Sequence, residues 1–334
     1  MLEHGGKLRE AAKEFHIPLS DWLDLSTGVS PFSYPCGSIP EWHWRRLPEE
    51  NDGLEEAAKS YYGGNYVLPV AGSQAAIQTL PLLRARAKAG FLHPSYNEHI
   101  GAWSRHGHAV EHISIDGLLQ AAANLDVIVL CNPNNPTGAQ VNVESLLQIA
   151  SLLEKRRGWL IVDEAFMDAN AHGSLVGETG MNETIIALRS FGKFFGLAGA
   201  RLGFMFAWPQ LILALSERLG PWTVPGPTRF LAKTALQDRQ WINSTRDRLQ
   251  KSSRRLQQTL IEHGLTPSGG TPLFHWVKTN EARTIHTKLA QTAVFTRLFE
   301  DPPSIRFGLP ASEDDWNHLE SALAKLNHLT HAQV

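Results

Sequence analysis

The stretch from Ser190 to Gly203 reads Ser190-Phe-Gly-Lys193-Phe-Phe-Gly-Leu-Ala-Gly-Ala-Arg201-Leu-Gly203 and follows an apolar run at 184–188. Glycines in such a turn let the backbone and a ligand approach closely, and Lys193 can act there as a nucleophile toward a carbonyl group. Arg201 adds a planar cation suited to phosphate. Taken alone, the segment fits a surface lysine in a flexible turn equally well, because Gly-rich turns containing lysine are common. The rest of the chain has to decide.

The composition indicates a globular protein of ordinary surface charge. The chain has 334 residues, of which 43% are hydrophobic and 19% charged, so we expect one large domain and a smaller one. The 31 basic and 33 acidic residues give a formal charge of −2. Because this balance offers no basic surface for phosphates, we expect neither nucleic acid nor an anionic membrane as a partner.

Cysteine and histidine usage argues against a metal or disulfide framework. Cys36 and Cys131 are the two cysteines of the sequence, and their spacing is not that of a metal site. The fifteen histidines, including the cluster at 106–112, show no helical metal pairing, so we expect no metal. The N-terminal residues lack an apolar core of signal-peptide length, and no run of eighteen apolar residues occurs. We therefore expect a cytoplasmic protein.

Strand-like and helix-like segments alternate from Tyr66 to Phe206. The segments 127–130 and 159–162 are continuous apolar runs typical of buried parallel strands. This alternation predicts an α/β fold with a mostly parallel sheet flanked by helices on both faces. Ligands of such sheets bind at the carboxyl ends of the strands, where Asn135 and Asp163 fall.

Two turns after predicted strands have the chemistry of binding sites. Gly72-Ser73-Gln74 follows a short strand at 66–70 and opens a helix, so backbone N–H groups and the helix dipole favour an anion there. A plain serine N-cap is the alternative. In the second turn, the two Asn/Pro pairs within residues 131–138 impose a fixed, non-helical conformation.

A composition break at 221–227 indicates a second, α+β domain. Beyond it we expect a long polar helix at 228–263 and short strands at 273–277, 293–298 and 305–307. The predicted division is a large cofactor-binding domain at 31–224 and a small domain formed by 1–30 together with 225–334.

Taken together, these segments supply the parts needed to hold pyridoxal 5′-phosphate. That cofactor requires a lysine for its aldehyde, a carboxylate for its pyridine nitrogen, a ring to stack on and a clamp for its phosphate. The chain offers, in order, the anion-binding turn Gly72–Gln74, Tyr96, Asn135, Asp163, Lys193 and Arg201.

Three motifs of the chain resemble the aspartate aminotransferase superfamily of pyridoxal-phosphate enzymes, known as fold type I. They are Asn-Pro-Asn-Asn-Pro-Thr-Gly at 132–138, Asp-Glu-Ala-Phe at 163–166, and the segment 190–203 quoted above. The resemblance implies that Lys193 forms the Schiff base with the cofactor, that Asp163 pairs with the pyridinium, and that Asn135 donates to the phenolic oxygen.

The same resemblance implies the remaining roles. Tyr96 would stack on the cofactor ring, and Arg306, in Ile-Arg-Phe-Gly-Leu, would pair with the substrate carboxylate. It also implies a homodimer to which the segment 31–48 contributes. The residues implied to hold the cofactor phosphate are Gly72, Ser73, Gln74, Ser190 and Arg201.

Within the superfamily, two segments resemble the threonine-phosphate decarboxylase family of cobalamin biosynthesis. They are residues 4–12, which begin His-Gly-Gly-Lys, and residues 23–31, which read Leu-Asp-Leu-Ser-Thr-Gly-Val-Ser-Pro. This resemblance implies decarboxylation of L-threonine O-3-phosphate to (R)-1-amino-2-propanol O-2-phosphate. A histidinol-phosphate-type aminotransferase is the main alternative, and a cofactor-binding protein without catalysis is the second. The implied substrate-binding residues are His4, Gly5, Gly28, Asn135 and Arg306.

Two positions depart from the superfamily pattern. Phe166 stands where many members have tyrosine, which leaves Asn135 as the implied protein donor to the phenolic oxygen. Leu47 precedes Pro48 where relatives place a tyrosine in the loop that reaches the neighbouring subunit's phosphate. The sequence therefore leaves both of these cofactor contacts open.

Overall fold

A computed structural model describes residues 5–170, 173–181 and 183–330. The chain divides into two compact units. The large unit contains residues 33–135 and 139–243, and the small unit contains the described residues of 1–32, 136–138 and 244–334. The boundary at 243/244 falls inside helix α11 (Arg239–Glu262).

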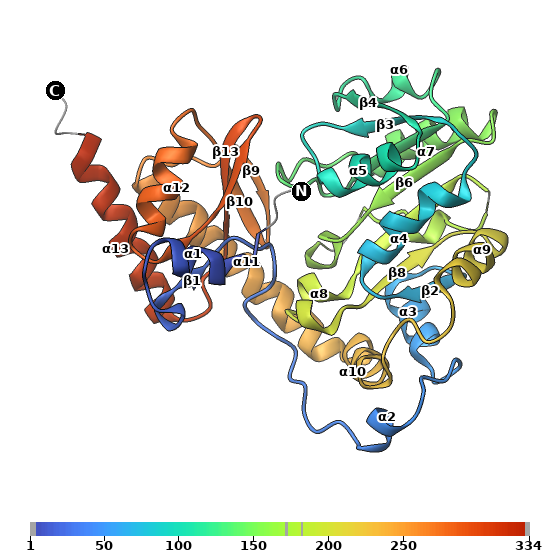
Figure 1. The fold of residues 1–334 in the computed structure, drawn as a ribbon, viewed down its shortest axis with the longest axis horizontal. Coiled ribbons are helices and arrows are strands. Elements are labelled where there is room, and N and C mark those ends of the chain that lie inside the picture. Colours follow the sequence, from blue (N-terminus) through green and yellow to red (C-terminus); the bar gives the residue numbers. More distant parts are fainter. Residues whose placement is uncertain (1–4, 171–172, 182, 331–334) are drawn as a thin grey trace. The chain divides into compact units, whose positions relative to one another are not determined.

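The large unit is built on a seven-stranded sheet with the order β2-β8-β7-β6-β5-β3-β4 (Figure 1). Strand β8 is antiparallel to both of its neighbours, and the other pairs are parallel. The predicted mostly parallel sheet is therefore confirmed. The strands are β2 (Val67–Val70), β3 (Lys88–Leu92), β4 (Ala109–Ile113), β5 (Val127–Cys131), β6 (Trp159–Asp163), β7 (Ile185–Ser190) and β8 (Gly203–Phe206).

Both faces of this sheet are covered by helices because its central strands are apolar on both sides. Side chains alternate along a strand, so Val127 and Val129 pack with α4, α5 and α9, whereas Ile128 and Leu130 pack with α6 and α7. The helices of the large unit are α2 (Trp42–Arg45), α3 (Leu54–Tyr62), α4 (Ser73–Thr79), α5 (Asn97–Arg105), α6 (Leu118–Ala121), α7 (Val143–Glu154), α8 (Phe191–Phe194), α9 (Pro209–Leu219) and α10 (Gly226–Gln237).

The small unit is α+β, as predicted. It contains a four-stranded antiparallel sheet with the order β12-β13-β10-β9 and a parallel pair, β1 with β11. The strand expected at 293–298 is two strands, because β11 pairs with β1 while β12 pairs with β13. The elements are α1 (Leu8–Glu14), β1 (Leu23–Asp24), β9 (Gly269–Thr271), β10 (Phe274–Lys278), α12 (Ala282–Ala290), β11 (Val294–Phe295), β12 (Arg297–Glu300), β13 (Pro303–Gly308) and α13 (Glu313–Thr330).

The long helix expected at 228–263 is two helices, α10 and α11, separated at Asp238. Asp238 has φ −80° and ψ 78°, which lies outside the helical region. Its Oδ1 accepts a hydrogen bond from the Trp241 N–H at 2.9 Å, as an N-cap does, and its Oδ2 accepts one from the Tyr34 hydroxyl at 3.3 Å. The side chain of Asp238 therefore starts a new helix rather than continuing the first.

Helix α10 belongs to the large unit, whereas the sequence placed it in the small domain. Arg229 of α10 is buried and pairs with Asp52 at 2.7 Å and with Glu55 of α3 at 2.8 Å. These ion pairs and the packing of α10 on α3 move the division of the chain from the composition break at 224/225 to 243/244.

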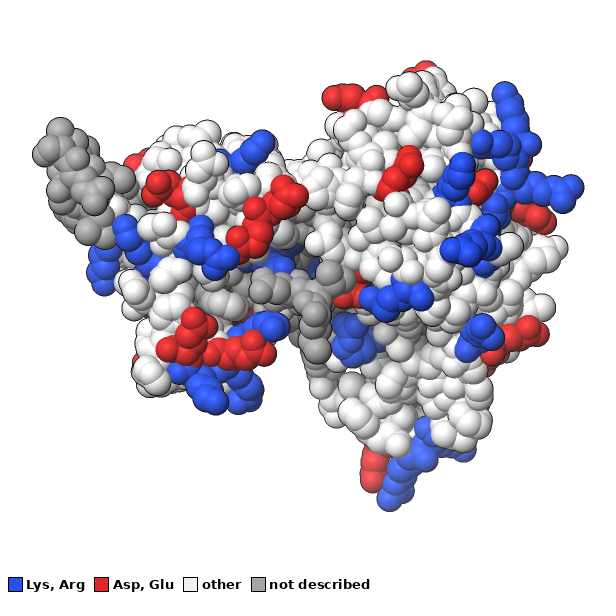
Figure 2. All heavy atoms as spheres, turned by 45° about the horizontal axis from the view of Figure 1, so that its top comes forward, with Lys and Arg blue, Asp and Glu red and all other residues white. Residues whose placement is uncertain are grey.

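The surface carries both signs of charge. Figure 2 shows Lys and Arg side chains interspersed with Asp and Glu side chains over the visible face, in keeping with the formal charge of −2. Among the described residues, the helices are too short or too polar to cross a membrane.

The cap at Asp238 gives a first prediction. Asp238→Ala should lower the free energy of unfolding by about 1 kcal/mol, because it removes the acceptor at the start of α11. Asp238→Asn is the matched control, since asparagine also caps helices well and can accept from Tyr34. Urea denaturation of the three proteins measures the difference. Equal losses for both variants would contradict the capping role.

Candidate active site

One pocket of the large unit brings together all nine residues that the sequence assigned to a cofactor. The pocket lies at the carboxyl ends of β5, β6 and β7 and at the start of α4. Parallel strands end at the same edge of a sheet, so residues far apart in sequence meet there. The lining residues are Gly72, Ser73, Gln74, Tyr96, Asn135, Asp163, Ser190, Lys193 and Arg201, together with Cys131, Ala165 and Phe166.

Two glycines shape the end of the pocket that contains Arg201. Gly72 has φ +73°, and a Cβ at this position would lie 2.6 Å from Nη2 of Arg201. A Cβ on Gly203 would lie 2.4 Å from the backbone nitrogen of Ser73. Both positions therefore exclude any side chain. A guanidinium thus lies against the N-terminus of α4, where the first N–H groups of a helix point outward, and this combination suits a phosphate.

Gln74 holds Tyr96 through its side chain. Its Nε2 donates to Glu98 at 2.8 Å, and its Oε1 accepts a hydrogen bond from the Tyr96 hydroxyl at 3.3 Å. Burial raises the pKa of the Tyr96 phenol, and the nearby Asp163 carboxylate raises it further. Tyr96 therefore stays neutral at physiological pH and presents an uncharged ring to the pocket. The part of Gln74 left for a phosphate is its backbone.

Asp163 forms a buried pair with His99, a residue that none of the sequence motifs includes. His99 Nε2 lies 2.9 Å from Asp163 Oδ2, and both side chains are at most 5% exposed. Oδ1 of Asp163 accepts a hydrogen bond from the Ala165 N–H at 3.1 Å. Burial lowers the pKa of His99, but the hydrogen bonds and charges of Asp163 and Cys131 together outweigh it and raise the pKa to about 9. At neutral pH, His99 is thus a cation beside the carboxylate.

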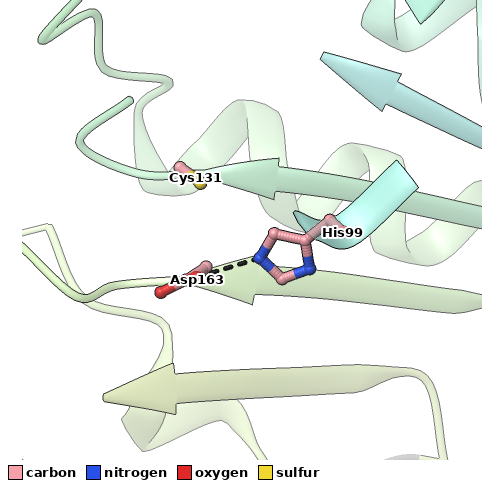
Figure 3. Close-up of side chains that lie close together, drawn as sticks. All are labelled: His99, Cys131 and Asp163. Atoms are coloured by element: carbon pink, nitrogen blue, oxygen red, sulfur yellow. Dashed lines mark hydrogen bonds and ion pairs between the residues drawn. The ribbon is translucent and has the colours of Figure 1, made fainter. Parts of the chain in front are cut away.

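Figure 3 shows His99 of α5 pointing between the ends of β5 and β6, toward Cys131 and Asp163. One donor atom from each of these three side chains lies within 4.8 Å of the other two. A sequence signal that could have found His99 is its position three residues after Tyr96, at the start of α5. The two rings are 6.1 Å apart between their centres, so both residues lie at the same strand ends.

The turn that carries Asn135 is fixed by its own side chains. Asn132 donates to the Val141 carbonyl at 3.0 Å and accepts from the Val141 N–H at 2.9 Å. Asn134 donates to the Pro94 carbonyl at 2.8 Å and accepts from the Ser95 hydroxyl at the same distance. These bonds tie the end of β5 to the loop before Tyr96, so Asn135 is presented in one orientation.

Lys193 lies in α8, the single turn that follows β7. Its Nζ is 5.6 Å from the centre of the Phe166 ring, over the ring face. Both residues line the pocket, so the aromatic side chain that replaces tyrosine contacts the lysine without offering a hydroxyl group. The short helix is too small to be set by its own hydrogen bonds, and the position of Lys193 depends on the packing of Phe191 and Phe194, which are fully buried.

Arg306 lies on β13 of the small unit and is 6% exposed. Its Nη2 donates to the Ser26 carbonyl at 3.0 Å, and its guanidinium lies 4.9 Å over the Phe274 ring. Arg297 of β12 is its direct cross-strand partner, so both side chains are on the same face of the sheet. No sequence motif indicates Arg297, because strand register is not visible in a sequence.

Two further substrate-binding candidates, Gly5 and Gly28, are also in the small unit, whereas Asn135 belongs to the large unit. Gly5 packs so closely on Ser26 that a Cβ would lie 2.4 Å from the Ser26 carbonyl oxygen, and the Gly6 N–H donates to Ser26 Oγ at 2.8 Å. Gly28 lies two residues beyond Ser26, in the loop after β1. His4 lies outside the described residues. The segment 5–6 is therefore bound to the same residue that holds Arg306.

Comparison with known proteins places the chain in a family. Residues 48–322 match the model of the family described as aminotransferase class I and II. The chain belongs to the aminotransferase class I and II family. It is 49% identical over 99% of its length to a threonine-phosphate decarboxylase from Pseudomonas aeruginosa, which it covers completely. It is 37% identical over 97% of its length to a threonine-phosphate decarboxylase from a Sinorhizobium species, covering 98% of that protein.

A solved structure of the same fold is that of a histidinol-phosphate aminotransferase from Sinorhizobium meliloti in complex with pyridoxal 5′-phosphate. The TM-score is 0.85 at 19% sequence identity, and the alignment covers 98% of this chain and 96% of the other. This likeness confirms the fold predicted from the sequence.

The pocket residues fit pyridoxal 5′-phosphate, the cofactor of the family. Gly72, Gly203 and Arg201 form a cradle that a side chain at either glycine position would fill. The cradle has hydrogen-bond donors suited to a phosphate. At the other end, the Asp163 carboxylate is paired with the His99 cation and can accept a pyridinium N–H. Lys193, which also lines the pocket, has a primary amine of the kind that forms a Schiff base with an aldehyde, so it would hold the cofactor aldehyde.

The pairing of His99 predicts how stability depends on pH. The pKa of about 9 in the folded protein exceeds the ordinary 6.5, so the stability that His99 contributes is complete below pH 6.5 and is lost as the pH rises through 9. The contribution is at most of the order of 3 kcal/mol. In cofactor-free protein, the loss caused by His99→Asn should be largest near pH 6 and should shrink at higher pH.

Urea denaturation over this pH range measures that difference, and a second buried histidine is the control. Burial lowers the pKa of His275, so its contribution is lost as the pH falls rather than as it rises. The loss caused by His275→Asn should therefore grow from low pH toward neutral pH. A pH-independent loss for His99→Asn would contradict the ion pair.

Proposed function

We propose that the protein is a pyridoxal-phosphate-dependent threonine-phosphate decarboxylase of cobalamin biosynthesis. It would convert L-threonine O-3-phosphate to (R)-1-amino-2-propanol O-2-phosphate and CO2. The observation that carries the proposal is the likeness over 99% of the chain to a threonine-phosphate decarboxylase, combined with a pocket that contains every residue type the cofactor requires.

The residues of the pocket divide the work of binding and proton transfer. When bound, the cofactor supplies a ring that accepts the electron pair released at the substrate Cα. Asp163, held by His99, keeps the ring nitrogen protonated, and Arg201 and the start of α4 bind the phosphate. Lys193 anchors the cofactor and then delivers a proton to Cα after CO2 has left. The neighbouring carbon, which bears the phosphate, takes no part and keeps the configuration it has in threonine.

The small unit offers a pair of cations that matches the two anionic groups of this substrate. Arg297 and Arg306 are directly opposite each other across β12 and β13, so two guanidinium groups lie close together on one face of the sheet. L-Threonine O-3-phosphate carries a carboxylate and a phosphate. We assign Arg306 to the carboxylate, because a planar guanidinium binds it in bidentate fashion, and Arg297 to the neighbouring phosphate.

Holding the carboxylate also selects the bond that breaks. A bond at Cα is weakened when it stands perpendicular to the cofactor ring, where it overlaps the π system. A decarboxylase must therefore hold the carboxylate out of the ring plane, whereas an aminotransferase holds the Cα–H bond there. In this proposal Arg306 fixes that orientation, and its own direction is set by the Ser26 carbonyl and the Phe274 ring.

The proposal includes a homodimer in the cytoplasm, where reducing conditions keep Cys36 and Cys131 as the thiols seen here. Three apolar side chains of the segment 31–48 support the dimer. Trp42, Trp44 and Leu47 are 54%, 67% and 62% exposed, which is costly for large apolar groups in a monomer.

Product analysis tests the proposed reaction. With threonine phosphate and the cofactor, the protein should release CO2 and aminopropanol phosphate in equal amounts, without need of 2-oxoglutarate. The control is the same assay with histidinol phosphate and 2-oxoglutarate. Transamination of histidinol phosphate without release of CO2 from threonine phosphate would replace the proposal with the aminotransferase.

Arg306→Ala should lower kcat/KM for threonine phosphate by roughly thirty- to a thousandfold, which corresponds to about 2–4 kcal/mol, because a buried charge-assisted contact is lost. Arg283→Ala is the matched control, since Arg283 is an exposed arginine of the same unit that pairs with Glu300. Its kcat/KM should stay near that of the wild type. A small effect of Arg306→Ala would remove the assignment of the carboxylate.

Sedimentation measures the assembly. A two-fold dimer should be the main species at micromolar concentration, and charged substitutions at Trp42 and Trp44 should shift it toward monomer. A fully active wild-type monomer would contradict the homodimer.

A further inference from the structure

A buried ion cluster lies directly behind the cofactor pocket. Arg189 Nη1 donates to Glu164 Oε2 at 2.7 Å, and its Nη2 donates to Asp168 Oδ1 at 2.5 Å. The guanidinium also lies 4.5 Å over the ring of Tyr62. The side chains of Arg189, Glu164 and Asp168 are at most 5% exposed, and none of them lines the pocket.

The sequence positions of the cluster tie it to the pocket residues. Glu164 directly follows Asp163 at the end of β6, and Arg189 directly precedes Ser190 at the end of β7. Successive side chains of an extended chain point to opposite faces. Asp163 and Ser190 consequently face the pocket, while the Glu164–Arg189 pair joins the same two strand ends from the other side.

The strand ladder stops where this pair begins. Asp163 is opposite Leu188 in the last register position of β6 with β7, and the Glu164 N–H donates to the Leu188 carbonyl at 2.8 Å. The Glu164 carboxylate makes two further bonds, to the Ser174 hydroxyl and to the Leu175 N–H, each at 2.6 Å. One carboxylate thus joins β6, β7 and the segment that begins at Ser174.

Stability alone does not explain such a cluster. Apolar side chains of similar volume in place of a buried ion cluster often give equal or greater stability. Burial raises the pKa of Glu164 against the influence of Arg189, and burial opposes the Arg189 cation, whose pKa the two carboxylates nevertheless raise. What the ions add over apolar packing is direction, because each hydrogen bond fixes both an angle and a distance.

We propose that the Glu164–Arg189 pair is a positioning device for the cofactor site. It sets the spacing between Asp163 and the Ser190–Lys193 turn, and so the angle between the cofactor ring and the lysine that holds it. Both are positioning residues, since they act through Asp163, Ser190 and Lys193. The inference rests on the cofactor site of the proposed function and is independent of the substrate.

A second cluster of the same unit provides a matched control. Arg229 is also a buried arginine held by two carboxylates, Asp52 and Glu55, at 2.7–2.9 Å. Their side chains are 26% and 20% exposed, and Glu55 lies on α3 rather than at a strand end beside the pocket. Glu164→Gln and Glu55→Gln therefore remove the same charge from the same kind of cluster.

The first readout needs no activity. In cofactor-free protein, amide hydrogen exchange at positions 164 and 175 should become about tenfold faster in Glu164→Gln. The reason is that the bonds of these two N–H groups, to the Leu188 carbonyl and to the side chain at position 164, are weakened. In the loaded enzyme, visible circular dichroism of the bound cofactor should change, since it reports the orientation of the ring in the protein. Glu55→Gln should leave both signals as in the wild type, although its melting temperature also falls.

Turnover of the cofactor-loaded enzyme should also distinguish Glu164→Gln from the control Glu55→Gln. Glu164→Gln should lower kcat by about ten- to a hundredfold with little change in KM, as expected for misplaced reacting groups rather than lost substrate contacts. Ser174→Ala removes one bond to Glu164 and keeps the ion pair, so it should shift the dichroism in the same direction by less. This milder variant decides the matter if Glu164→Gln does not fold.

Unchanged dichroism and exchange in Glu164→Gln and Ser174→Ala would overturn the proposal. Equal changes in Glu55→Gln would also overturn it, because the effect would then be a general loss of stability. Failure of the decarboxylase assignment is distinguishable, since it would appear in the product analysis and would leave the exchange and dichroism comparison intact.

Discussion

The ion pair between Asp163 and His99 depends on the meeting of three separate chain segments at one edge of a parallel sheet. β5 and β6 end side by side, and the helix that begins after Tyr96 brings an imidazole between them. Because the site is buried, neither charge would be stable there alone. Each therefore fixes the other, and the carboxylate faces the pocket with its orientation set by His99 and by the Ala165 N–H.

Close backbone contact shapes the opposite end of the pocket. Gly72 and Gly203 let Arg201 and the start of α4 come within distances that a methyl group would prevent. Polar contacts fix the Asp163 end of the site, whereas two glycines, which have no side chain, shape the Arg201 end. The antiparallel strand β8 matters for this reason, since it carries Gly203 to the beginning of α4.

In the small unit, a single residue, Ser26, contacts both Arg306 and the segment that contains Gly5. The Ser26 carbonyl accepts from Arg306, and the Ser26 side chain accepts from the Gly6 N–H. The segment after α1 thus orders the arginine that we assign to the substrate. Its neighbour Arg297 becomes relevant only through the pairing of β12 with β13.

The sequence by itself determined the α/β class, the cofactor and the nine pocket residues, because these depend on short motifs and on strand and turn chemistry that are local in the chain. It did not determine the break at Asp238, the membership of α10, or His99, Arg297 and the Glu164–Arg189 pair. Apart from the cap that Asp238 makes on the Trp241 N–H, those features depend on contacts between residues 9 to 204 positions apart, such as Asp238 with Tyr34 and Arg306 with Arg297. Only tertiary structure brings such groups together, since strand register and burial decide which charges meet and which remain in water.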